Sequence, residues 1–194
     1  MERKHYHYKA NKPFGFLSQF TSGEKRQLRN KRFLSELYPF AEGTMPIGRL
    51  DEKSEGLLLL TTDGKLSDHI NSSGVEKEYY AQLDGVITDD AIEQIQNGVA
   101  IGLYGKSYTT RLCVAERIVP PTFLPPSHRQ LRIGVHRPTS WISIRVTEGK
   151  FRQVRKMTAS VGFPTVRLVR VRIGAITLDG LPEGAVVPLS EVLV

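Results

Sequence analysis

The sequence is poor in the features that mark secreted and membrane proteins. It contains one cysteine, Cys113, so no internal disulfide can form, and a reducing cytoplasmic compartment is the expectation. The polar start MERKHYHY lacks the apolar core of a secretory signal. No stretch approaches the roughly 18 consecutive apolar residues of a membrane span. We therefore expect a cytoplasmic protein with no membrane partner.

Signatures of several enzyme classes are also missing. The histidines show no metal-ligand spacing with Cys113, and no Gly-x-Ser-x-Gly elbow occurs. Gly105-Lys106-Ser107 ends like a phosphate-binding loop, but Ala100 stands where that loop requires its first glycine. These absences argue against a metal site, a nucleotide cofactor and a serine nucleophile.

Acidic residues are scarce in two segments. The chain has 27 basic and 20 acidic residues, a net charge of +7. Residues 3–32 contain Glu24 as their one acid, and residues 145–172 contain Glu148 as theirs, against nine and eight basic residues respectively. A basic footprint of this kind suits a polyanion such as nucleic acid. A solvated basic face without a ligand would give the same pattern.

The hydrophobic pattern predicts an α+β fold with a mixed, mostly antiparallel sheet and flanking helices in one domain. Residues 139–147 alternate cleanly, which predicts a strand with Ile142, Ile144 and Val146 on a core face and a wet opposite face. A proline-rich loop is expected over 120–128. We expect helices near residues 28–38, 65–70 and 88–98, and a fourth helix from the break at Glu148-Gly149 to about Ser160. Further strands are expected near residues 57–60, 79–83, 108–118 and 166–173.

One acid stands out as a candidate for chemistry. Asp51 lies between Gly48-Arg49-Leu50 and a Ser54–Gly56 turn that leads into four leucines. The leucine run predicts a buried strand, so Asp51 is expected on a tight loop fixed against the core, where catalytic groups often lie. An aspartate that only caps the turn would fit the same pattern.

Two other segments could complete a site. Tyr79-Tyr80 follows three charged residues, and residues 148–157 predict a helix that starts with several cations. Taken singly, Tyr79 would fit an ordinary aromatic residue of a sheet, and the cations Arg152, Arg155 and Lys156 would fit a solvated helical face. Together with Asp51 they provide a nucleophile, an aromatic surface for a base and guanidinium groups for phosphates.

These segments resemble the motifs of the pseudouridine synthases, in the branch that modifies ribosomal RNA and includes the large-subunit type E enzymes. The resemblance extends over roughly residues 9 to 182. The matching segments are Gly48-Arg49-Leu50-Asp51 with the leucine run, Asn11-Lys12-Pro13, Lys77-Glu78-Tyr79, residues 148–157, and Arg167-Leu168-Val169-Arg170.

The resemblance implies a catalytic fold of two lobes around a central cleft, with residues 1–194 as a single catalytic domain. Many relatives carry a small S4-type RNA-binding domain before the Lys-Pro turn, whereas ten residues precede that turn here, so we expect no such N-terminal domain. It also implies isomerisation of uridine to pseudouridine in ribosomal RNA, with the large subunit preferred, no cofactor and a monomeric enzyme. The implied roles are Asp51 as nucleophile, Tyr79 on the base, Arg155 paired with the nucleophile, Leu168 in the pocket wall, and Lys12, Arg49, Lys77, Arg152 and Lys156 on RNA phosphates.

Arg155 would have an electrostatic reason for its place. A nucleophilic carboxylate must be ionised, and burial favours its neutral form, whereas an arginine within ion-pair reach favours the charged form.

The alternative to an enzyme is a non-catalytic RNA-binding or ribosome-assembly protein. RNA containing 5-fluorouridine would separate the two, because a catalyst is expected to form a tight or covalent adduct with it.

Overall fold

A computed structural model describes residues 4–131, 133–135 and 137–192. Arg3, counted above in the first basic segment, lies outside the described residues. The chain divides into two compact units. The first unit combines Met1–Val75 with Arg170–Val194, and the second is the continuous segment Glu76–Val169.

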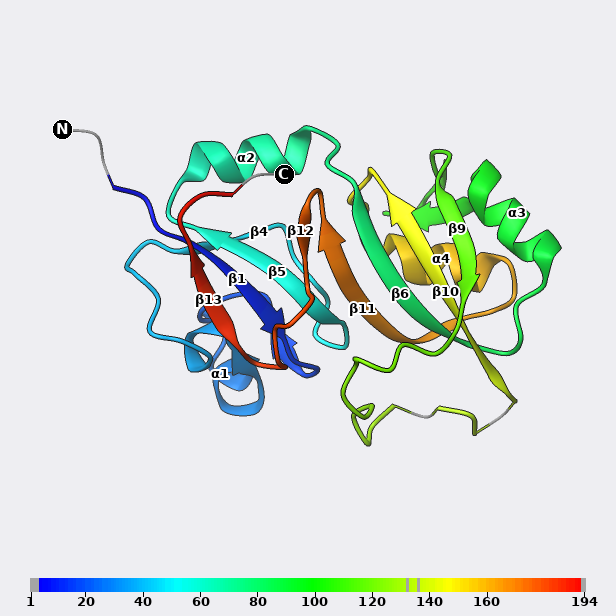
Figure 1. The fold of residues 1–194 in the computed structure, drawn as a ribbon, viewed down its shortest axis with the longest axis horizontal. Helices are drawn as coiled ribbons and strands as arrows, with labels where there is room; N and C mark the ends of the chain where they lie inside the picture. The colour runs from blue at the N-terminus through cyan, green and yellow to red at the C-terminus, as the bar shows by residue number, and fades with distance from the viewer. Residues whose placement is uncertain (1–3, 132, 136, 193–194) are drawn as a thin grey trace. The chain divides into compact units, whose positions relative to one another are not determined.

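The first unit is built on antiparallel strands. Strand β1 pairs with β5 on one side and with β13 on the other, and β4 pairs with β5. Helix α2 packs against β4 and β5 (Figure 1). The elements are β1 (His7–Lys12), β2 (Phe16–Leu17), α1 (Lys25–Asn30), β3 (Arg32–Phe33), η1 (Leu34–Glu36), β4 (Met45–Ile47), β5 (Glu55–Thr61), α2 (Gly64–Ser72), β12 (Ile176–Thr177) and β13 (Val186–Leu189).

The leucine run forms the centre of this unit, as the sequence predicts. All seven residues of β5 are buried, and the side chains of residues 57–60 have no exposed surface. A strand covered on both faces reads as a continuous apolar run rather than an alternating one. Leu58 and Leu60 pack with Tyr8, Ala10 and Leu34, so β5 is firmly held in the core.

The single helix expected near residues 28–38 is wrong. Helix α1 ends at Asn30 and buries none of its residues. Phe33 then pairs with Leu17 in a short parallel ladder, and Leu34 enters the core from the 3-10 turn η1. The apolar residues thus reach the core from several short elements, which their spacing alone does not distinguish from one helical stripe.

The second unit has an antiparallel sheet in which β10 lies between β6 and β9. A separate hairpin is formed by β7 and β8, and α4 packs against β7. Figure 1 shows α4 behind β6 and β10. The elements are β6 (Lys77–Asp84), α3 (Asp89–Asn97), β7 (Ala100–Leu103), β8 (Lys106–Thr109), β9 (Val114–Ile118), β10 (Thr139–Val146) and α4 (Gln153–Ser160).

The predicted ends of α3 are confirmed. The Thr88 hydroxyl accepts a hydrogen bond from the Ala91 N–H at 3.2 Å, and Gly98 ends the helix with φ +92°. Ile95 from α3 and Met157 from α4, both fully buried, pack into the core formed with β6 and β10. The two helices therefore cover the sheet of this unit.

Two strand predictions need correction. The expected strand 108–118 is interrupted, because the backbone N–H groups of Thr110 and Cys113 bond to Val99 and Gln96 instead of a neighbouring strand. The face of β10 expected to be wet is buried at Trp141 and Ser143, whereas Arg145 is half-buried and Thr147, just after the strand, is exposed. Trp141 is 8% exposed and Ser143 is 2% exposed. The Ser143 hydroxyl donates to Glu78 at 2.8 Å, so the polar residue here marks a partly buried hydrogen bond.

Strand β11 (Thr165–Ile173) belongs to both units, with 165–169 in the second and 170–173 in the first. The α+β class with a mostly antiparallel sheet is confirmed. The cleft expected between two lobes stays a prediction.

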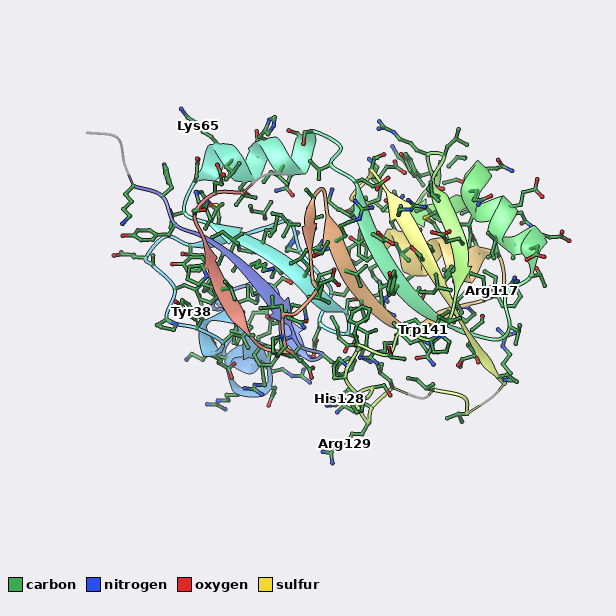
Figure 2. All side chains as sticks on the ribbon, viewed as in Figure 1. Tyr38, Lys65, Arg117, His128, Arg129 and Trp141 are labelled. Carbon is green, nitrogen blue, oxygen red and sulfur yellow. The ribbon has the colours of Figure 1, made fainter. Side chains whose placement is uncertain are left out.

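Among the described residues, no helix is long and apolar enough to cross a bilayer. The proline-rich segment 120–128 has no regular structure, and Arg129 beside it points away from the strands (Figure 2).

Candidate functional site

Asp51 lies on the loop that joins β4 to β5 in the first unit. Ser18 fixes this loop, because its hydroxyl accepts from the Leu50 N–H at 3.0 Å and donates to the Leu50 carbonyl at 2.8 Å. The Ser54 N–H donates to the Asp51 carbonyl at 3.0 Å and closes a turn. Asp51 itself is half-buried. Its carboxylate is therefore carried by a backbone that is hydrogen-bonded on both sides.

The start of the loop depends on Gly48. Its φ of +67° is one that residues with a Cβ rarely adopt. A Cβ built there would lie 3.1 Å from the Asn71 side-chain oxygen of α2. The glycine of the Gly-Arg-Leu-Asp segment thus has a steric reason for its place.

Lys12 is a buried support for the residue after Asp51. It has no exposed surface, and its ammonium donates to the carbonyls of Phe16 at 2.7 Å, Pro13 at 2.9 Å and Glu52 at 3.4 Å. Burial lowers the pKa of Lys12 to about 7, although nearby carboxylates, including Asp51, act in the opposite direction. The prediction that Lys12 contacts an RNA phosphate does not fit this structure.

Glu52 is fixed from a second direction. Its carbonyl accepts from the Gly15 N–H at 2.8 Å, and its carboxylate pairs with the Lys31 ammonium at 2.8 Å. Sequence reasoning did not single out Ser18 or Glu52. Glu52 follows Asp51 directly, so its position in the sequence is a signal that it belongs to the same loop. Ser18 carries no pattern that separates it from other serines.

In the second unit, a buried carboxylate holds the loop before α4. Glu148 accepts hydrogen bonds from the Tyr108 hydroxyl, from the Arg111 N–H at 2.9 Å and from the Gln153 amide at 2.9 Å. Burial alone would raise the pKa of Glu148, but these three donors outweigh it and the pKa lies below its ordinary value. The predicted helix start is therefore fixed to the β7–β8 hairpin.

This fixed loop leads into the three predicted cations of α4. Arg152 is exposed and precedes the helix in a left-handed conformation, with φ +52°. Arg155 is half-buried and donates from Nη1 to the Thr165 carbonyl of β11 at 3.2 Å. The Lys156 ammonium donates to the Gly102 carbonyl at 2.6 Å. Arg155 thus lies beside the strand that carries Leu168.

The remaining predicted residues differ in exposure. Tyr79 on β6 is partly buried against the core of the second unit, and Leu168 on β11, 5% exposed, belongs to that core. Lys77 is half-buried at the start of β6. Arg49 is exposed on the Asp51 loop, as a phosphate contact requires.

The structure groups these residues by unit. Asp51, Arg49 and Lys12 belong to the first unit, and the six others belong to the second. The pairing of Asp51 with Arg155 stays a prediction.

Part of the second basic segment serves the interior. Arg170 is 3% exposed and donates from Nε to the Leu57 carbonyl at 2.8 Å, beside the leucine run. Arg167 is 4% exposed and donates to the Pro125 carbonyl at 3.0 Å. The count of basic residues over 145–172 therefore overstates the positive surface.

Comparison with known proteins identifies the family. The family model for RNA pseudouridylate synthase matches residues 6–160. The ribosomal large subunit pseudouridine synthase E of Vibrio parahaemolyticus is 39% identical, over 90% of this chain and 69% of its own length. The enzyme of that name from Xanthomonas axonopodis is 38% identical, over 88% of this chain and 87% of its own. The ribosomal small subunit pseudouridine synthase A of Escherichia coli is 32% identical, over 95% and 71%.

A solved structure agrees with these sequence matches. The crystal structure of a pseudouridylate synthase superimposes with a TM-score of 0.73 at 27% identity, over 96% of this chain and 71% of that one. The family model spans most of the chain, and the Asp51 loop lies within it. The chain therefore belongs to the RNA pseudouridylate synthase family and is an RNA pseudouridine synthase, an isomerase.

Proposed function

We propose that this enzyme isomerises a specific uridine of large-subunit ribosomal RNA, with Asp51 as the nucleophile. Two relatives named for the large subunit are 38% and 39% identical to the chain, whereas the relative named for the small subunit is 32% identical. This difference favours the large subunit as the source of the substrate.

The observation that carries the proposal is the fixed loop around Asp51. Its backbone is held by Ser18 at Leu50, by Lys12 and Gly15 at Glu52, and by the turn at Ser54. A catalytic group must keep its position to within fractions of an ångström, and a loop bonded at successive residues provides this. A turn cap would need no such support.

The reaction rearranges the substrate without net oxidation. The bond between uracil N1 and ribose C1′ breaks, and a bond between uracil C5 and C1′ forms. C5 loses its proton and N1 gains one, so atoms and electrons balance without a redox cofactor. The Asp51 carboxylate acts on the uridine as nucleophile while the base is detached and turned.

The other proposed residues bind and position the uridine. A stacked uridine must be flipped out at a cost of a few kcal/mol, and stacking on Tyr79 returns about 1–3 kcal/mol of that. In this proposal Arg155 keeps the carboxylate ionised, and Leu168 shields the pocket from water. Arg49, Lys77, Arg152 and Lys156 hold the RNA phosphates, because arginine and lysine supply the charge that this contact needs.

Asp51→Asn is the test, with release of tritium from C5 of labelled uridine in large-subunit ribosomal RNA as the measurement. We expect the variant to lose turnover while it still binds RNA, because the amide keeps the shape of the side chain but is not a nucleophile. Asp68→Asn, an exposed acid on α2, is the matched control and should turn over normally.

Wild-type turnover by Asp51→Asn would overturn the role of Asp51. Normal turnover on small-subunit RNA with none on large-subunit RNA would overturn the choice of substrate. Mapping pseudouridines in cells with and without the gene would then identify the uridine.

A further inference from the structure

The second unit carries an exposed aromatic and cationic surface that includes Arg152 and Lys156, but the proposed function gives no role to its aromatic rings. We call it the Tyr104 surface, and it consists of Tyr104, Lys106, Lys150, Phe151, Arg152 and Lys156. Tyr104 is 89% exposed, and Phe151 is 55% exposed. Large aromatic side chains on an enzyme surface commonly mark a binding site.

Backbone strain is concentrated on this surface. Among the described residues, two that are not glycine have positive φ, and these are Tyr104 at +50° and Arg152 at +52°. Tyr104 and Gly105 form the two-residue turn of the β7–β8 hairpin, a turn that favours Asn-Gly or Asp-Gly. Strained residues tend to cluster at functional sites. A tyrosine at this turn position makes the turn less stable than asparagine or aspartate would, and it places an aromatic ring on the surface.

The rings and cations form one array. The Tyr104 and Phe151 rings are close to parallel, with 27° between their planes and 6.4 Å between their centres. The Lys156 ammonium lies 5.0 Å from the centre of the Phe151 ring and donates to the Gly102 carbonyl. The Lys150 ammonium lies 5.0 Å from the centre of the Tyr108 ring. The hairpin and the start of α4 thus present their aromatic groups with cations beside them.

The charge of this surface has one sign. Its six residues include four cations and no acid, and the nearby Glu148 is buried and turned towards Tyr108. The acids Asp90 and Glu93 line a pocket with Ser160 at the other end of α4. A polyanion with flat bases matches aromatic rings flanked by cations.

We propose that the Tyr104 surface binds single-stranded RNA that flanks the target uridine, with a base stacked on Tyr104 and phosphates held by Lys106 and Arg152. This inference rests on the proposed function, because it takes RNA to be the substrate. It adds a contact outside the site of chemistry, where the enzyme holds the neighbouring strand of its substrate.

Tyr104→Asn is the informative variant, because asparagine removes the ring and suits the left-handed turn. Binding is measured by fluorescence anisotropy with a single-stranded RNA of about twelve nucleotides, the upper range for such sites. The loss of one stacked base should weaken binding about 5- to 150-fold. An oligomer with abasic positions should bind wild type as weakly as intact RNA binds Tyr104→Asn.

Salt dependence separates stacking from charge. Tyr104→Asn should keep the wild-type slope of log affinity against log salt, whereas Lys106→Gln should reduce it by about 0.7. Tyr6→Asn is the matched control, since Tyr6 is also exposed, at 44%, beside the Lys4 ammonium in the first unit. It should bind the oligomer like wild type.

Wild-type binding by Tyr104→Asn, or an equal loss in Tyr6→Asn, would overturn the inference. A change of sedimentation from dimer to monomer with unchanged RNA affinity would show a contact between protein chains instead. The proposed function is tested separately by tritium release. If Asp51→Asn loses turnover while Tyr104→Asn binds normally, the function stands and the Tyr104 surface does not.

Discussion

The Tyr108 hydroxyl donates a hydrogen bond to the buried Glu148 carboxylate, which joins strand β8 to the loop before α4. The bond raises the pKa of Tyr108. Glu148 also accepts from the backbone of Arg111 and the side chain of Gln153, so one carboxylate connects three segments of the second unit. The cations of α4 take their positions from this connection.

Glu148→Gln is expected to destabilise the protein by about 1–3 kcal/mol. The amide keeps the shape of the side chain but puts an N–H₂ group opposite one of three donors, so a buried polar group loses its partner. The free energy of unfolding in urea measures the loss. Glu116→Gln is the control, because its ion pair with Arg145 is exposed and should contribute about 0–1 kcal/mol.

Acid sensitivity should follow from the same residue. The pKa of Glu148 is lower in the folded chain than in the unfolded chain, so its stabilisation is present above the unfolded value and is lost as the pH falls through the folded one. Below about pH 4.5, wild type should lose stability faster than Glu148→Gln. Parallel acid transitions in the two proteins would contradict this.

Lys12→Met should remove a pH dependence on the alkaline side. The folded chain releases the Lys12 proton near pH 7, whereas the unfolded chain keeps it until about pH 10.5. The unfolded state thus binds more protons in this interval, and wild-type stability should rise with pH, by at most about 1.4 kcal/mol per unit. Urea unfolding at pH 7.0, 7.8 and 8.5 measures the slope.

The control for Lys12 is Lys9→Met, three residues earlier on β1 and half-buried. This variant retains Lys12 and should keep the wild-type slope. Equal slopes in Lys12→Met and wild type would show that the buried ammonium does not lose its proton in this range.

Gly98→Ala should cost about 2–4 kcal/mol of stability. Gly98 has φ +92°, and a Cβ there would lie 2.4 Å from the Thr110 carbonyl oxygen, a backbone atom that cannot turn away. Gly102→Ala is the matched control in the same region, because its Cβ would meet nothing within 4 Å. It should change stability by less than about 1 kcal/mol.

Arg155→Ala should lower turnover far more than RNA affinity. If Arg155 keeps Asp51 ionised, its removal should reduce kcat by about 10²-fold or more, with a small change in Kd for ribosomal RNA. Arg155→Lys should recover only part of kcat, because lysine lacks the planar fork. Arg152→Ala should instead raise Kd and leave kcat close to wild type. An equal loss of kcat and affinity in Arg155→Ala would contradict the ion-pair role.

The sequence predicts the fold best where local signals are strong. Thr88 and Gly98 mark both ends of α3, and the leucine run marks β5, because caps, glycines and long apolar runs act over a few residues. It fails where tertiary contacts decide. Nothing near Phe33 indicates a parallel ladder with Leu17, and nothing near Ser143 indicates that its hydroxyl bonds to Glu78.

The candidate site shows the same division. Asp51 and Arg155 stand out as motif residues, and the structure places Asp51 on the loop before β5 and Arg155 in the first turn of α4, as the sequence predicts. The burial of Lys12 is not predictable from the sequence, because a lysine is normally solvated and only the folded chain shows three carbonyls around its ammonium. The Tyr104 surface depends on a turn geometry that residue types do not disclose.

The division of the chain bears on how the enzyme is made. Asn11 bonds to the carbonyls of Ala185 and Leu181 at 3.0 and 2.8 Å, so the end of β1, and Lys12 next to it, are fixed by residues synthesised some 170 positions later. The second unit is one continuous segment, so it can fold during synthesis before residues 170–194, which complete the first unit, have been made. Lys12, which bonds to the Glu52 carbonyl of the Asp51 loop, is therefore held at the end of β1 only after residues 181–185 have been made.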